Sequence, residues 1–582
     1  MSDSLRVDSY TVNDIFVNYV SDKFFVNRKY QRKLVWEIKE KRLLIDSILK
    51  GIPLPAILIA QFKQTADGSE ILEIVDGMQR LNAIVSFLLG EFSVDYDGKK
   101  CYFDASAYAE TFPLLRDGKL KEHADVLPKN VCQEFYRYQI PAIITGQDDD
   151  TIKLIFGRIN STGRKISSHD MRQSMSVGRF PDLVRRIASH VRKDFTFDDR
   201  VNLADMPKVS VGPICFGYGV DQDTVFWRRH DLITPSDIKA SKDEEIIETL
   251  IAAVLLGNDF VKSKTRLDAL YEEGTSLNKK IEQKMSEFDD GVLETKFVKV
   301  FDTFDMVFDS IESDFSSSMF SRKKVSNKDE CFKILFLALY RLLDEDYVIH
   351  DYARVAGAIK DAADILNAFT KRGKVDYQKA NKAVVNLYQL LKSVFLKQVP
   401  KRHSKLEIEL DKRLSYSKIE LQMTEFKIGI SDYRAAEFNY NCIHAITRTL
   451  VAMSNTNNVN EIGYVLIGVA DSSSAYEKWY QIFQEKAVII NQHYVPGVAC
   501  EAEKLYGKSH KASEDSYLQA LQKALSKEPV NVQLKNFILE NIELIDYHGV
   551  DVVVLKSKHV GVVSTYDGCV YVRHGGDTIK AE

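Results

Sequence analysis

The sequence predicts an α+β multidomain protein, because three regions of the chain differ in their pattern of apolar and β-branched residues. Residues 10–180 mix short β-branched runs with short helices, whereas residues 181–398 carry helical periodicity almost throughout. After residue 405 the β-branched runs return, again with helices between them. A chain of 582 residues is long enough for several separately folded cores. We therefore expect three domains, at 1–180, 181–400 and 405–582.

The composition is that of an ordinary globular protein. Hydrophobic residues make up 45% and charged residues 28% of the chain, and the net charge is −4, so any nucleic-acid surface must be a local patch. The seven cysteines lie far apart without a Cys-x-x-Cys pair, which argues against a zinc module and a disulfide framework. The sequence shows neither a membrane-spanning apolar run nor a signal-peptide pattern at its start. We expect a cytoplasmic protein with no membrane partner.

The first functional signal is the sequence Asp76-Gly77-Met78-Gln79-Arg80. It follows the apolar run 71–75 and precedes the amphipathic segment 81–89, which predicts a strand, a glycine turn and a helix. The free N–H groups at a helix start attract anions, and an arginine there can bind phosphate oxygens. An ordinary strand–helix turn with solvated polar residues is the alternative. We expect Arg80 to be exposed and to contribute little to the core.

Two further stretches extend this signal. Tyr30-Gln31-Arg32 precedes Trp36, and residues 158–163 read Arg-Ile-Asn-Ser-Thr-Gly. Together with the glycine turn, these stretches resemble the DGQQR domain of GmrSD-type restriction proteins in order and spacing over residues 10–180. The resemblance implies a ParB-like α/β fold. Met78 stands where the family usually has a glutamine, so the family's nucleotide preference does not carry over.

The resemblance also implies a site that binds or hydrolyses a nucleoside triphosphate (NTP). Arg80 and Arg158 would contact the phosphates, since arginine clamps stabilise charge on a transferring phosphoryl group. Asp76 would orient a metal or water, and Gln79 would position the attacking water or the base. The expected nucleotide-binding residues are Tyr30, Gln31, Arg32, Gly77, Arg80, Arg158, Asn160, Ser161 and Gly163.

The middle of the chain carries no chemical motif. The segments 244–256, 332–340 and 380–391 have helical periodicity, and their aromatic and leucine side chains are expected to form a core. Pro400 and the basic cluster that follows it, including Lys401 and Arg402, indicate a domain boundary. The cluster is interpreted either as a solvated linker or as a patch that contacts phosphates.

The C-terminal region carries a second ordered set of motifs. It reads E-L-Q-M-T-E-F-K at 420–427, A-M-S-N-T at 452–456, Y-V-L-I-G-V-A-D at 464–471 and Y-V-R-H-G-G-D-T at 571–578. This order resembles the Schlafen-type AlbA domain, which has an α+β fold and acts on nucleic acid. In its catalytically active members, the positions matching Glu420, Glu425 and Asp471 form a metal-dependent ribonuclease centre. Many AlbA-type domains bind nucleic acid without cutting it, and both possibilities remain open.

Three carboxylates suit a Mg²⁺ or Mn²⁺ ion, which neutralises a phosphate and activates water. The spacing of Glu420 and Glu425 places them on different faces of either a strand or a helix, so they converge only if the chain turns between them. Carboxylates gathered without a metal repel one another, and an amide at any of the three positions is expected to keep or raise stability in EDTA. The residues expected to contact nucleic acid are Lys427, Arg164, Lys165, Lys401, Arg402 and Arg573. Arg172 is expected to join this phosphate-contacting set.

Two other signals are set aside. Residues 502–509 end like a P-loop, but they have alanine where the first glycine belongs and lie in polar helical sequence. An HNH-like nuclease at the C-terminus would need a histidine pattern that the chain lacks.

Three functional hypotheses follow from these motifs. In the first, an NTP-binding or NTP-hydrolysing N-terminal domain controls a metal-dependent nuclease in an anti-phage defence effector. In the second, the protein is a non-catalytic, nucleotide-switched regulator that binds nucleic acid. In the third, the N-terminal domain nicks DNA. The expected partners are phage DNA, or tRNA or another RNA, together with a nucleotide, a possible second copy of the chain, and a partner protein or phage trigger.

Overall fold

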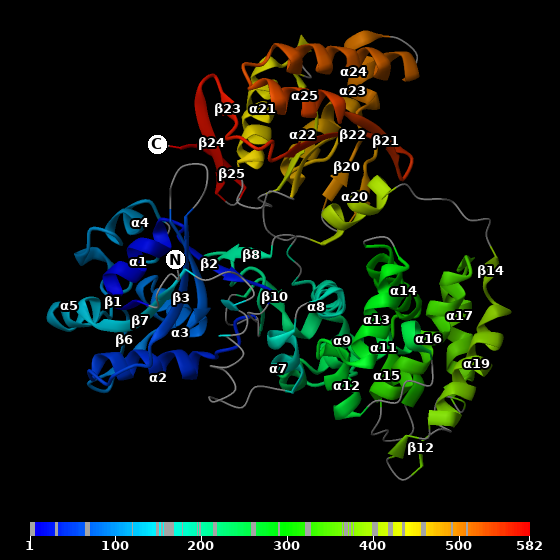
Figure 1. Ribbon diagram of the computed structural model, residues 1–582, viewed down its shortest axis with the longest axis horizontal. Coiled ribbons are helices and arrows are strands. Elements are labelled where there is room, and N and C mark those ends of the chain that lie inside the picture. Colours follow the sequence, from blue (N-terminus) through cyan, green and yellow to red (C-terminus); the bar gives the residue numbers. More distant parts are fainter. Residues whose placement is uncertain are drawn as a thin grey trace.

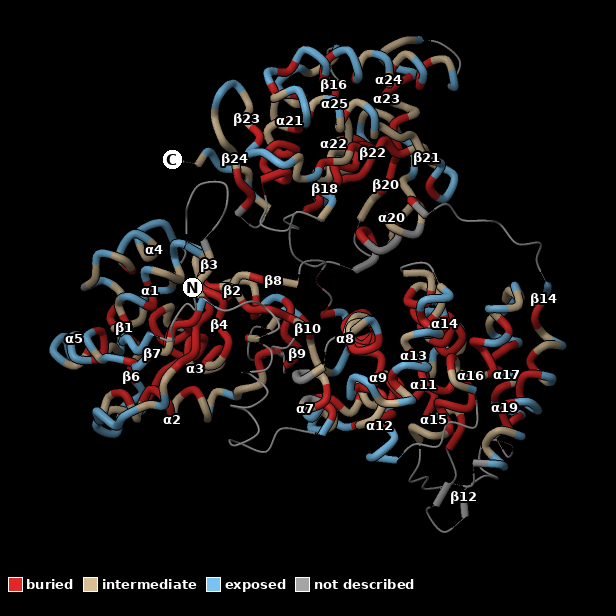
Figure 2. The backbone as a smooth tube through the Cα atoms, viewed as in Figure 1, coloured by how far each residue is buried: buried red, intermediate tan, exposed pale blue. Residues whose placement is uncertain are grey.

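The computed structural model folds the chain into three units with separate hydrophobic cores, so the protein is a mixed α/β multidomain molecule (Figures 1 and 2). Within the described part of the chain, no helix combines the length and apolar composition needed to cross a bilayer. The structure describes residues 6–29, 33–63, 70–118, 120–146, 151–152, 155, 168–176, 178–194, 196, 199–212, 218–257, 263–288, 291–320, 328–363, 365, 370–371, 374–375, 377–397, 405–416, 423–432, 437–455, 461–490, 493–507, 510–574 and 576–581.

A six-stranded mixed sheet of order β1-β7-β3-β4-β2-β8 forms the first unit. One face packs against helices in the largest N-terminal core, and the other carries a small cluster around Leu58, Val75 and Ile152. The sheet takes its sixth strand from residues 200–202, beyond the boundary at 180 expected from the sequence. The elements are β1 Arg6–Thr11, α1 Val12–Val20, β2 Phe24–Asn27, α2 Ile38–Leu49, β3 Ile57–Lys63, β4 Glu70–Asp76, α3 Met78–Leu88, β5 Val94–Tyr96, β6 Lys99–Cys101, α4 Phe112–Arg116, α5 Lys129–Arg137, β7 Gln139–Thr145 and β8 Arg200–Asn202.

The predicted strand and helix around the glycine turn are confirmed as β4 and α3. Apolar residues dominate the middle of β4, which suits a strand in the interior of a sheet. Gly77 lies between the two elements in the left-handed conformation with φ +105°. That conformation ends the strand and starts the helix within one residue, so the side chains of residues 76–80 gather at one corner.

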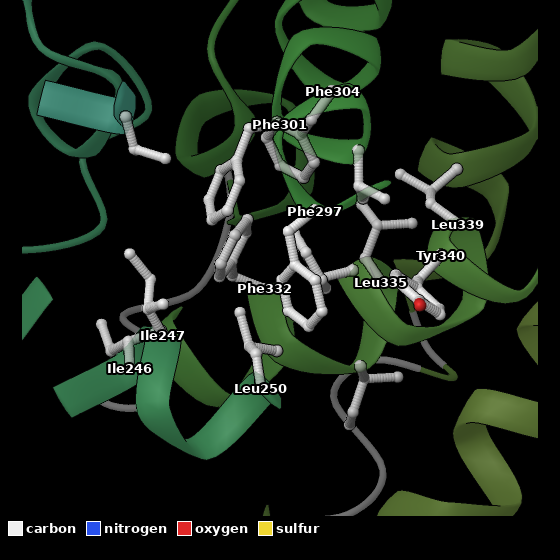
Figure 3. Close-up of a cluster of buried hydrophobic side chains, with 14 of the residues drawn as sticks. Ile246, Ile247, Leu250, Phe297, Phe301, Phe304, Phe332, Leu335, Leu339 and Tyr340 are labelled. Carbon is white, nitrogen blue, oxygen red and sulfur yellow. The ribbon is translucent and has the colours of Figure 1, made fainter. Parts of the chain in front are cut away.

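The second unit is predominantly helical, and the predicted helices at 244–256, 332–340 and 380–391 are confirmed within α11, α16 and α19. Its core is rich in phenylalanine, and Figure 3 shows Phe297, Phe301 and Phe332 meeting between three helices. The helices are α7 Ser168–Met175, α8 Arg179–Arg192, α9 Phe226–Arg229, α10 Pro235–Lys239, α11 Lys242–Leu256, α12 Lys264–Tyr271, α13 Ser276–Ser286, α14 Val292–Asp309, α15 Phe315–Phe320, α16 Lys328–Asp344, α17 Tyr352–Asp361 and α19 Tyr377–Lys392. Short strand pairs interrupt them: β9 Val211–Gly212 with β10 Val220–Asp221, β11 Tyr347–Val348 with β14 Leu396–Lys397, and β12 Thr370–Lys371 with β13 Lys374–Val375.

The third unit contains a four-stranded sheet of order β15-β18-β22-β21 and a smaller sheet of order β23-β24-β25. Helix α21 packs against both sheets, and apolar side chains cover both faces of the larger one. The predicted strands at 464–469, 552–555 and 569–572 are confirmed in β18, β22 and β24. The elements are α20 Lys405–Tyr416, β15 Thr424–Lys427, β16 Ser431–Asp432, β17 Glu437–Phe438, α21 Tyr440–Ser454, β18 Ile462–Ile467, α22 Ser473–Phe483, β19 Val488–Ile490, β20 His493–Val495, α23 Ala499–Tyr506, α24 His510–Lys527, α25 Val532–Glu540, β21 Glu543–Tyr547, β22 Val550–Lys558, β23 Thr565–Tyr566, β24 Cys569–His574 and β25 Asp577–Lys580.

We predict that Gly77→Ala destabilises the protein more than Gly98→Ala. Both glycines have positive φ, but a Cβ at Gly77 would lie 2.5 Å from Ile57 Cγ2, whereas nothing lies within 4 Å of a Cβ at Gly98. The backbone cost is about 1–2 kcal/mol at either site, and the clash at Gly77 adds roughly 1–3 kcal/mol. Thermal melting of both variants against the unmodified chain measures the difference. Equal melting temperatures would contradict the close packing at the corner.

Candidate functional site

The corner between β4 and α3 holds Arg80 in place through bonds to the protein itself. Its Nη2 lies 2.7 Å from Asp76 Oδ2 and donates to the Ala56 carbonyl at 3.2 Å, while Nη1 donates to the carbonyl of Pro55. The side chain is 13% exposed, so the expectation of an exposed Arg80 was wrong. Burial lowers the pKa of Arg80, while Asp76 opposes that shift. Arg80 therefore ties the end of β4 to the start of β3.

Gln79 is likewise engaged within the protein. Its Oε1 accepts from the backbone N–H groups of Val35 at 3.1 Å and Trp36 at 3.2 Å, and its Nε2 donates to the Lys33 carbonyl at 3.1 Å. A primary amide is the side chain that can both accept and donate in this way. The glycine-turn motif thus holds the 33–36 segment, which lies next to Tyr30-Gln31-Arg32 in the sequence.

Met78 faces the interior. It is 4% exposed and belongs to the core between the sheet and its helices. At this position the chain supplies apolar volume to the core and no polar group to the corner.

A buried ion network joins helices α7, α8 and α11 of the helical unit, and Arg28 of the first unit reaches it through Asp194. Arg192, at the end of α8, bonds to Asp194 at 3.0 Å, to Asp243 at 2.6 Å and to Glu244 at 2.9 Å. His169, on α7, contacts Glu244 through Nε2 and Glu248 through Nδ1, both at 2.9 Å. Because burying an ion costs several kcal/mol unless it is paired, each of these groups depends on its partners.

The same network fixes the pKa values of its members. Burial alone would lower the pKa of His169, but the carboxylates of Glu248 and Glu244 raise it to about 10. Burial would raise the pKa of Glu244, but Arg192 and His169 lower it below its ordinary range. His169 is therefore protonated and Glu244 ionised at neutral pH.

Two cations beside the network lack full compensation. Lys33 is 5% exposed, and its Nζ has no hydrogen-bond partner among the described residues. Arg28 is 7% exposed; its Nη2 pairs with Asp194 at 3.6 Å, whereas its Nη1 has no hydrogen-bond partner in the described part of the chain. Burial lowers the pKa of the Lys33 ammonium, and the charge of Arg192 lowers it further. Lys33 is the first residue of the segment that Gln79 holds, and it follows the predicted nucleotide-binding residue Arg32 in the sequence.

Several predicted site residues lie outside the described residues. In the N-terminal half these are Tyr30, Gln31, Arg32, Arg158, Asn160, Ser161, Gly163, Arg164 and Lys165. In the second half they are Lys401, Arg402 and Glu420. Arg172 is described; its side chain is buried and forms ion pairs with Glu248 at 2.8 Å and with Asp268 at 3.2 Å. The expectation that Arg172 joins a phosphate-contacting surface was therefore wrong.

The C-terminal motifs converge around Glu425. Its carboxylate pairs with Lys427 and lies 3.1 Å from Arg573 Nη1. The same Nη1 donates to the Thr578 hydroxyl at 3.1 Å, and that hydroxyl lies 3.0 Å from the hydroxyl of Thr449 on α21. Arg573 is 3% exposed, so this cluster holds β15, β24 and α21 together rather than offering Arg573 at the surface.

Asn455 and Asp471 belong to other parts of the third unit's architecture. The Asn455 side chain donates to the carbonyls of Ser564 and Tyr571, both at 2.9 Å, and so fixes the start of the small sheet. Asp471 is exposed beyond the end of β18, where its Oδ1 accepts from Ser472 Oγ at 3.0 Å. In the described ranges, no group of three or more His, Cys, Asp or Glu side chains could hold a metal ion.

Sequence reasoning missed the ion network and Lys33. The partners of His169 are 79 and 75 residues away, and those of Arg192 on α11 are 51 and 52 residues away, so no local motif indicates these contacts. One signal was available: Glu248 interrupts the otherwise apolar stretch 246–256 of a predicted core helix. A carboxylate at such a position needs a buried partner from elsewhere in the chain.

The first unit is thus an α/β domain with a strand–glycine–helix corner whose polar side chains are held from several elements. Residues 12–176 match a family model described as the N-terminal domain of the GmrSD restriction endonuclease. This match confirms the N-terminal part of the resemblance and indicates a link to restriction of foreign nucleic acid. No curated protein matches the chain in a sequence comparison. The Schlafen-type resemblance of the C-terminal region stays a prediction.

The network predicts how stability depends on pH. The pKa of His169 is raised from the ordinary 6.5 to about 10. The contribution of His169 to folding stability is therefore complete below about pH 6.5 and is lost as the pH rises through 10. Glu244 has a lowered pKa, so its contribution is present above its ordinary value of 4.5 and is lost on acidification. His169→Gln should therefore lower the melting temperature most between pH 4.5 and 6.5, the ordinary pKa values of the two groups, and least in alkali. The exposed His350→Gln is the control, and a pH-independent effect of His169→Gln would contradict the network.

Proposed function

We propose that this protein is a prokaryotic anti-phage defence effector in which an NTP-binding or NTP-hydrolysing N-terminal domain controls a C-terminal domain that acts on nucleic acid. The observation that supports the proposal is the corner at residues 76–80, in the domain that matches the GmrSD N-terminal model. Action on nucleic acid is consistent with a family of restriction endonucleases. The proposed location is the cytoplasm, and the proposed partners are phage DNA, tRNA or another RNA, a phage trigger and possibly a second copy of the chain.

The contacts of Arg80 and Gln79 modify their proposed roles. Arg80 reaches a phosphate only if it keeps or exchanges its bond to Asp76, so the pair would act together at the end of β4. Gln79 would act by holding residues 33–36, and hence Lys33, in position. The buried ammonium of Lys33 is a strong candidate to face a phosphate, because an anion would supply the partner that it lacks. Tyr30, Gln31, Arg32, Arg158, Asn160, Ser161 and Gly163 complete the proposed site.

The ion network supports control of one domain by another. Helix α7 follows the Arg-x-Asn-Ser loop directly in sequence, and His169 clamps α7 to α11 of the helical unit. A nucleotide that reorders this loop would shift α7, and α7 cannot move without breaking buried charge pairs. A nucleotide-switched regulator without catalysis uses the same linkage, and a DNA nickase would place the chemistry at the corner itself. Both remain alternatives that the following experiment separates.

The test of the N-terminal site is phosphate release from each NTP by the purified full chain. Arg80→Lys and Asp76→Asn should each lower kcat/KM by roughly 10²–10³-fold, the usual effect of removing one preorganised charge contact. Arg80→Lys should also lower the melting temperature, because it removes the bonds to Pro55 and Ala56. Arg116→Lys, at an exposed arginine of the same domain, should leave both unchanged. Absence of NTP binding by calorimetry would overturn the proposal, and binding without turnover would favour the regulator.

Metal-dependent cleavage in the C-terminal domain is the second candidate function. It is favoured by the convergence of Glu425 with Arg573 and Thr578, which come from two separate motifs. The proposed Mg²⁺ or Mn²⁺ ligands are Glu420, Glu425 and Asp471, and the ion would activate a water for attack on a phosphodiester. The two cations bound to Glu425 do not suit a carboxylate that waits for a metal, because they already neutralise it. We therefore derive no catalytic step through the ion.

Glu425→Gln tests this candidate in EDTA, where the structure reverses the expectation from the sequence. Removing the charge leaves Arg573 buried without its ionic partner, so the variant should melt at a lower temperature, by about 1–3 kcal/mol of stability. Exposed Glu437→Gln is the matched control. A Mg²⁺- or Mn²⁺-dependent melting shift that Glu425→Gln abolishes would support a metal at this site. Unchanged or raised stability of Glu425→Gln in EDTA would contradict the ion-pair role.

A further inference from the structure

Helix α21 presents three functional side chains on one stripe of its surface. Tyr440, His444 and Arg448 are spaced four residues apart, which places them one above another on the same face. The opposite face, with Ile443, Ile446 and Leu450, is buried in the core of the third unit. Figure 1 shows α21 beside β23 and β24, which line its flank.

The imidazole ring of His444 is oriented by hydrogen-bonding partners, as the ring of an acid–base residue would be. Its Nδ1 lies 2.9 Å from Glu528 Oε2 and 3.1 Å from the Tyr566 hydroxyl, and that hydroxyl donates to the same Glu528 oxygen at 2.9 Å. Glu528 is 4% exposed, whereas the His444 side chain is 43% exposed. Among the described residues, the ring makes its hydrogen bonds through Nδ1, which leaves Nε2 available on a side chain that is 43% exposed. A buried carboxylate on Nδ1 fixes the orientation and the tautomer of the ring.

Arg448 supplies a cation next to this histidine. Its Nε donates to the His444 carbonyl at 3.3 Å, and among the described residues it forms no ion pair. The charge of Arg448 acts on the nearby Tyr566 hydroxyl. Burial and the contact with Glu528 together raise the pKa of Tyr566 to about 12, and the charge of Arg448 opposes this shift. An unpaired guanidinium beside an oriented imidazole is suited to bind a phosphate oxygen.

Tyr440 adds an aromatic surface at the other end of the stripe. It is 56% exposed, and its ring meets that of Phe438 edge-on at 5.4 Å between centroids. Exposed aromatic rings next to cationic groups are typical of sites for single-stranded nucleic acid, since every base can stack on them. The stripe thus combines a base-stacking ring, an oriented imidazole and a free guanidinium within two helical turns.

We propose that Tyr440, His444 and Arg448 form a metal-independent site for the phosphodiester of single-stranded RNA, with Glu528 and Tyr566 as positioning residues. His444 Nε2 takes the proton of a ribose 2′-hydroxyl, and the 2′-oxygen forms a bond to phosphorus. The bond from phosphorus to the 5′-oxygen breaks, and the leaving oxygen takes a proton from solvent water. Arg448 stabilises the charge on the phosphoryl oxygens. The products are a 2′,3′-cyclic phosphate and a 5′-hydroxyl, and His444 returns its proton to solvent.

This inference rests on the proposed action of the C-terminal domain on nucleic acid, but not on the N-terminal NTP site or on the Glu425 cluster. RNA is the favoured substrate because its own 2′-hydroxyl serves as the nucleophile, so the residues of the stripe suffice for the chemistry. DNA lacks that hydroxyl. The two sites of the third unit therefore differ in their dependence on metal, on the 2′-hydroxyl and on particular residues.

The experiment uses the full chain, single-stranded RNA and excess EDTA, with and without each NTP. We expect cleavage with cyclic-phosphate ends, and none for RNA that carries 2′-deoxyribose at the cleaved position. His444→Ala should lower the rate by roughly 10²–10⁴-fold and be partly rescued by added imidazole. Arg448→Gln should lower it by roughly 10²–10³-fold. Tyr440→Ala should raise KM with little effect on kcat, and Glu528→Gln should lower kcat with KM unchanged.

Exposed His548→Ala is the matched control in the same unit and should cleave like the unmodified chain. Thermal melting in EDTA checks that each variant is folded. Equal cleavage of DNA, or retained activity of a folded His444→Ala, would overturn the proposal. So would absence of cleavage under every condition. Cleavage that requires Mg²⁺ or Mn²⁺ and depends on Glu425 but not His444 would overturn it in favour of the metal site, and loss of NTP turnover alone would leave it standing.

Discussion

The buried charges that join α7, α8 and α11, and that reach the first unit through Arg28, are the constraint on which the rest of the structure depends. Asp243 and Glu248 are fully buried on α11, and they are tolerable there only because Arg192, His169 and Arg172 reach them from other elements. Such networks add little net stability, since the desolvation of each ion offsets its pairing. Their effect is geometric. An apolar contact tolerates a small slip, whereas a displaced buried ion pair does not, so α7 and α8 have one position against α11.

This constraint reaches the corner at residues 76–80, the proposed nucleotide site, through a short series of contacts. Gln79 holds the 33–36 segment, Lys33 lies at its start, and the charges of Arg192 and Asp194 act on Lys33 and Arg28 from the helical unit. The corner and the helical unit therefore share one electrostatic environment. A change of charge at the corner, such as a bound phosphate, would alter the balance that holds Lys33 and Arg28. That is a physical route by which nucleotide could act on the helical unit without a large hinge.

The sequence predicted elements well and side-chain partners poorly, for a physical reason. Strand β4 and helix α3 follow from a local apolar pattern, and the glycine between them was correctly placed. Arg80 was predicted to be exposed because its acceptors at Pro55 and Ala56 lie in a distant part of the sequence, just before β3. Glu425 pairs with Arg573, which lies 148 residues away in the sequence. Because the sequence does not reveal this partner, we expected Glu425 to be repelled by other carboxylates, whereas the structure pairs it with a cation. Local sequence patterns determine which helix or strand carries a side chain, whereas tertiary contacts determine which charged groups surround it.

The same distinction separates two kinds of polar residue in the third unit. Glu425 and Arg573 neutralise each other and join three elements, so their chemistry is largely committed to the fold. His444 is oriented by two partners on one nitrogen, while its other nitrogen faces outward. A reacting group needs both properties, because an unheld side chain loses the benefit of orientation and a fully bonded one cannot exchange a proton. By this criterion, the surface of α21 is better prepared for proton transfer than the cluster to which the sequence motifs point.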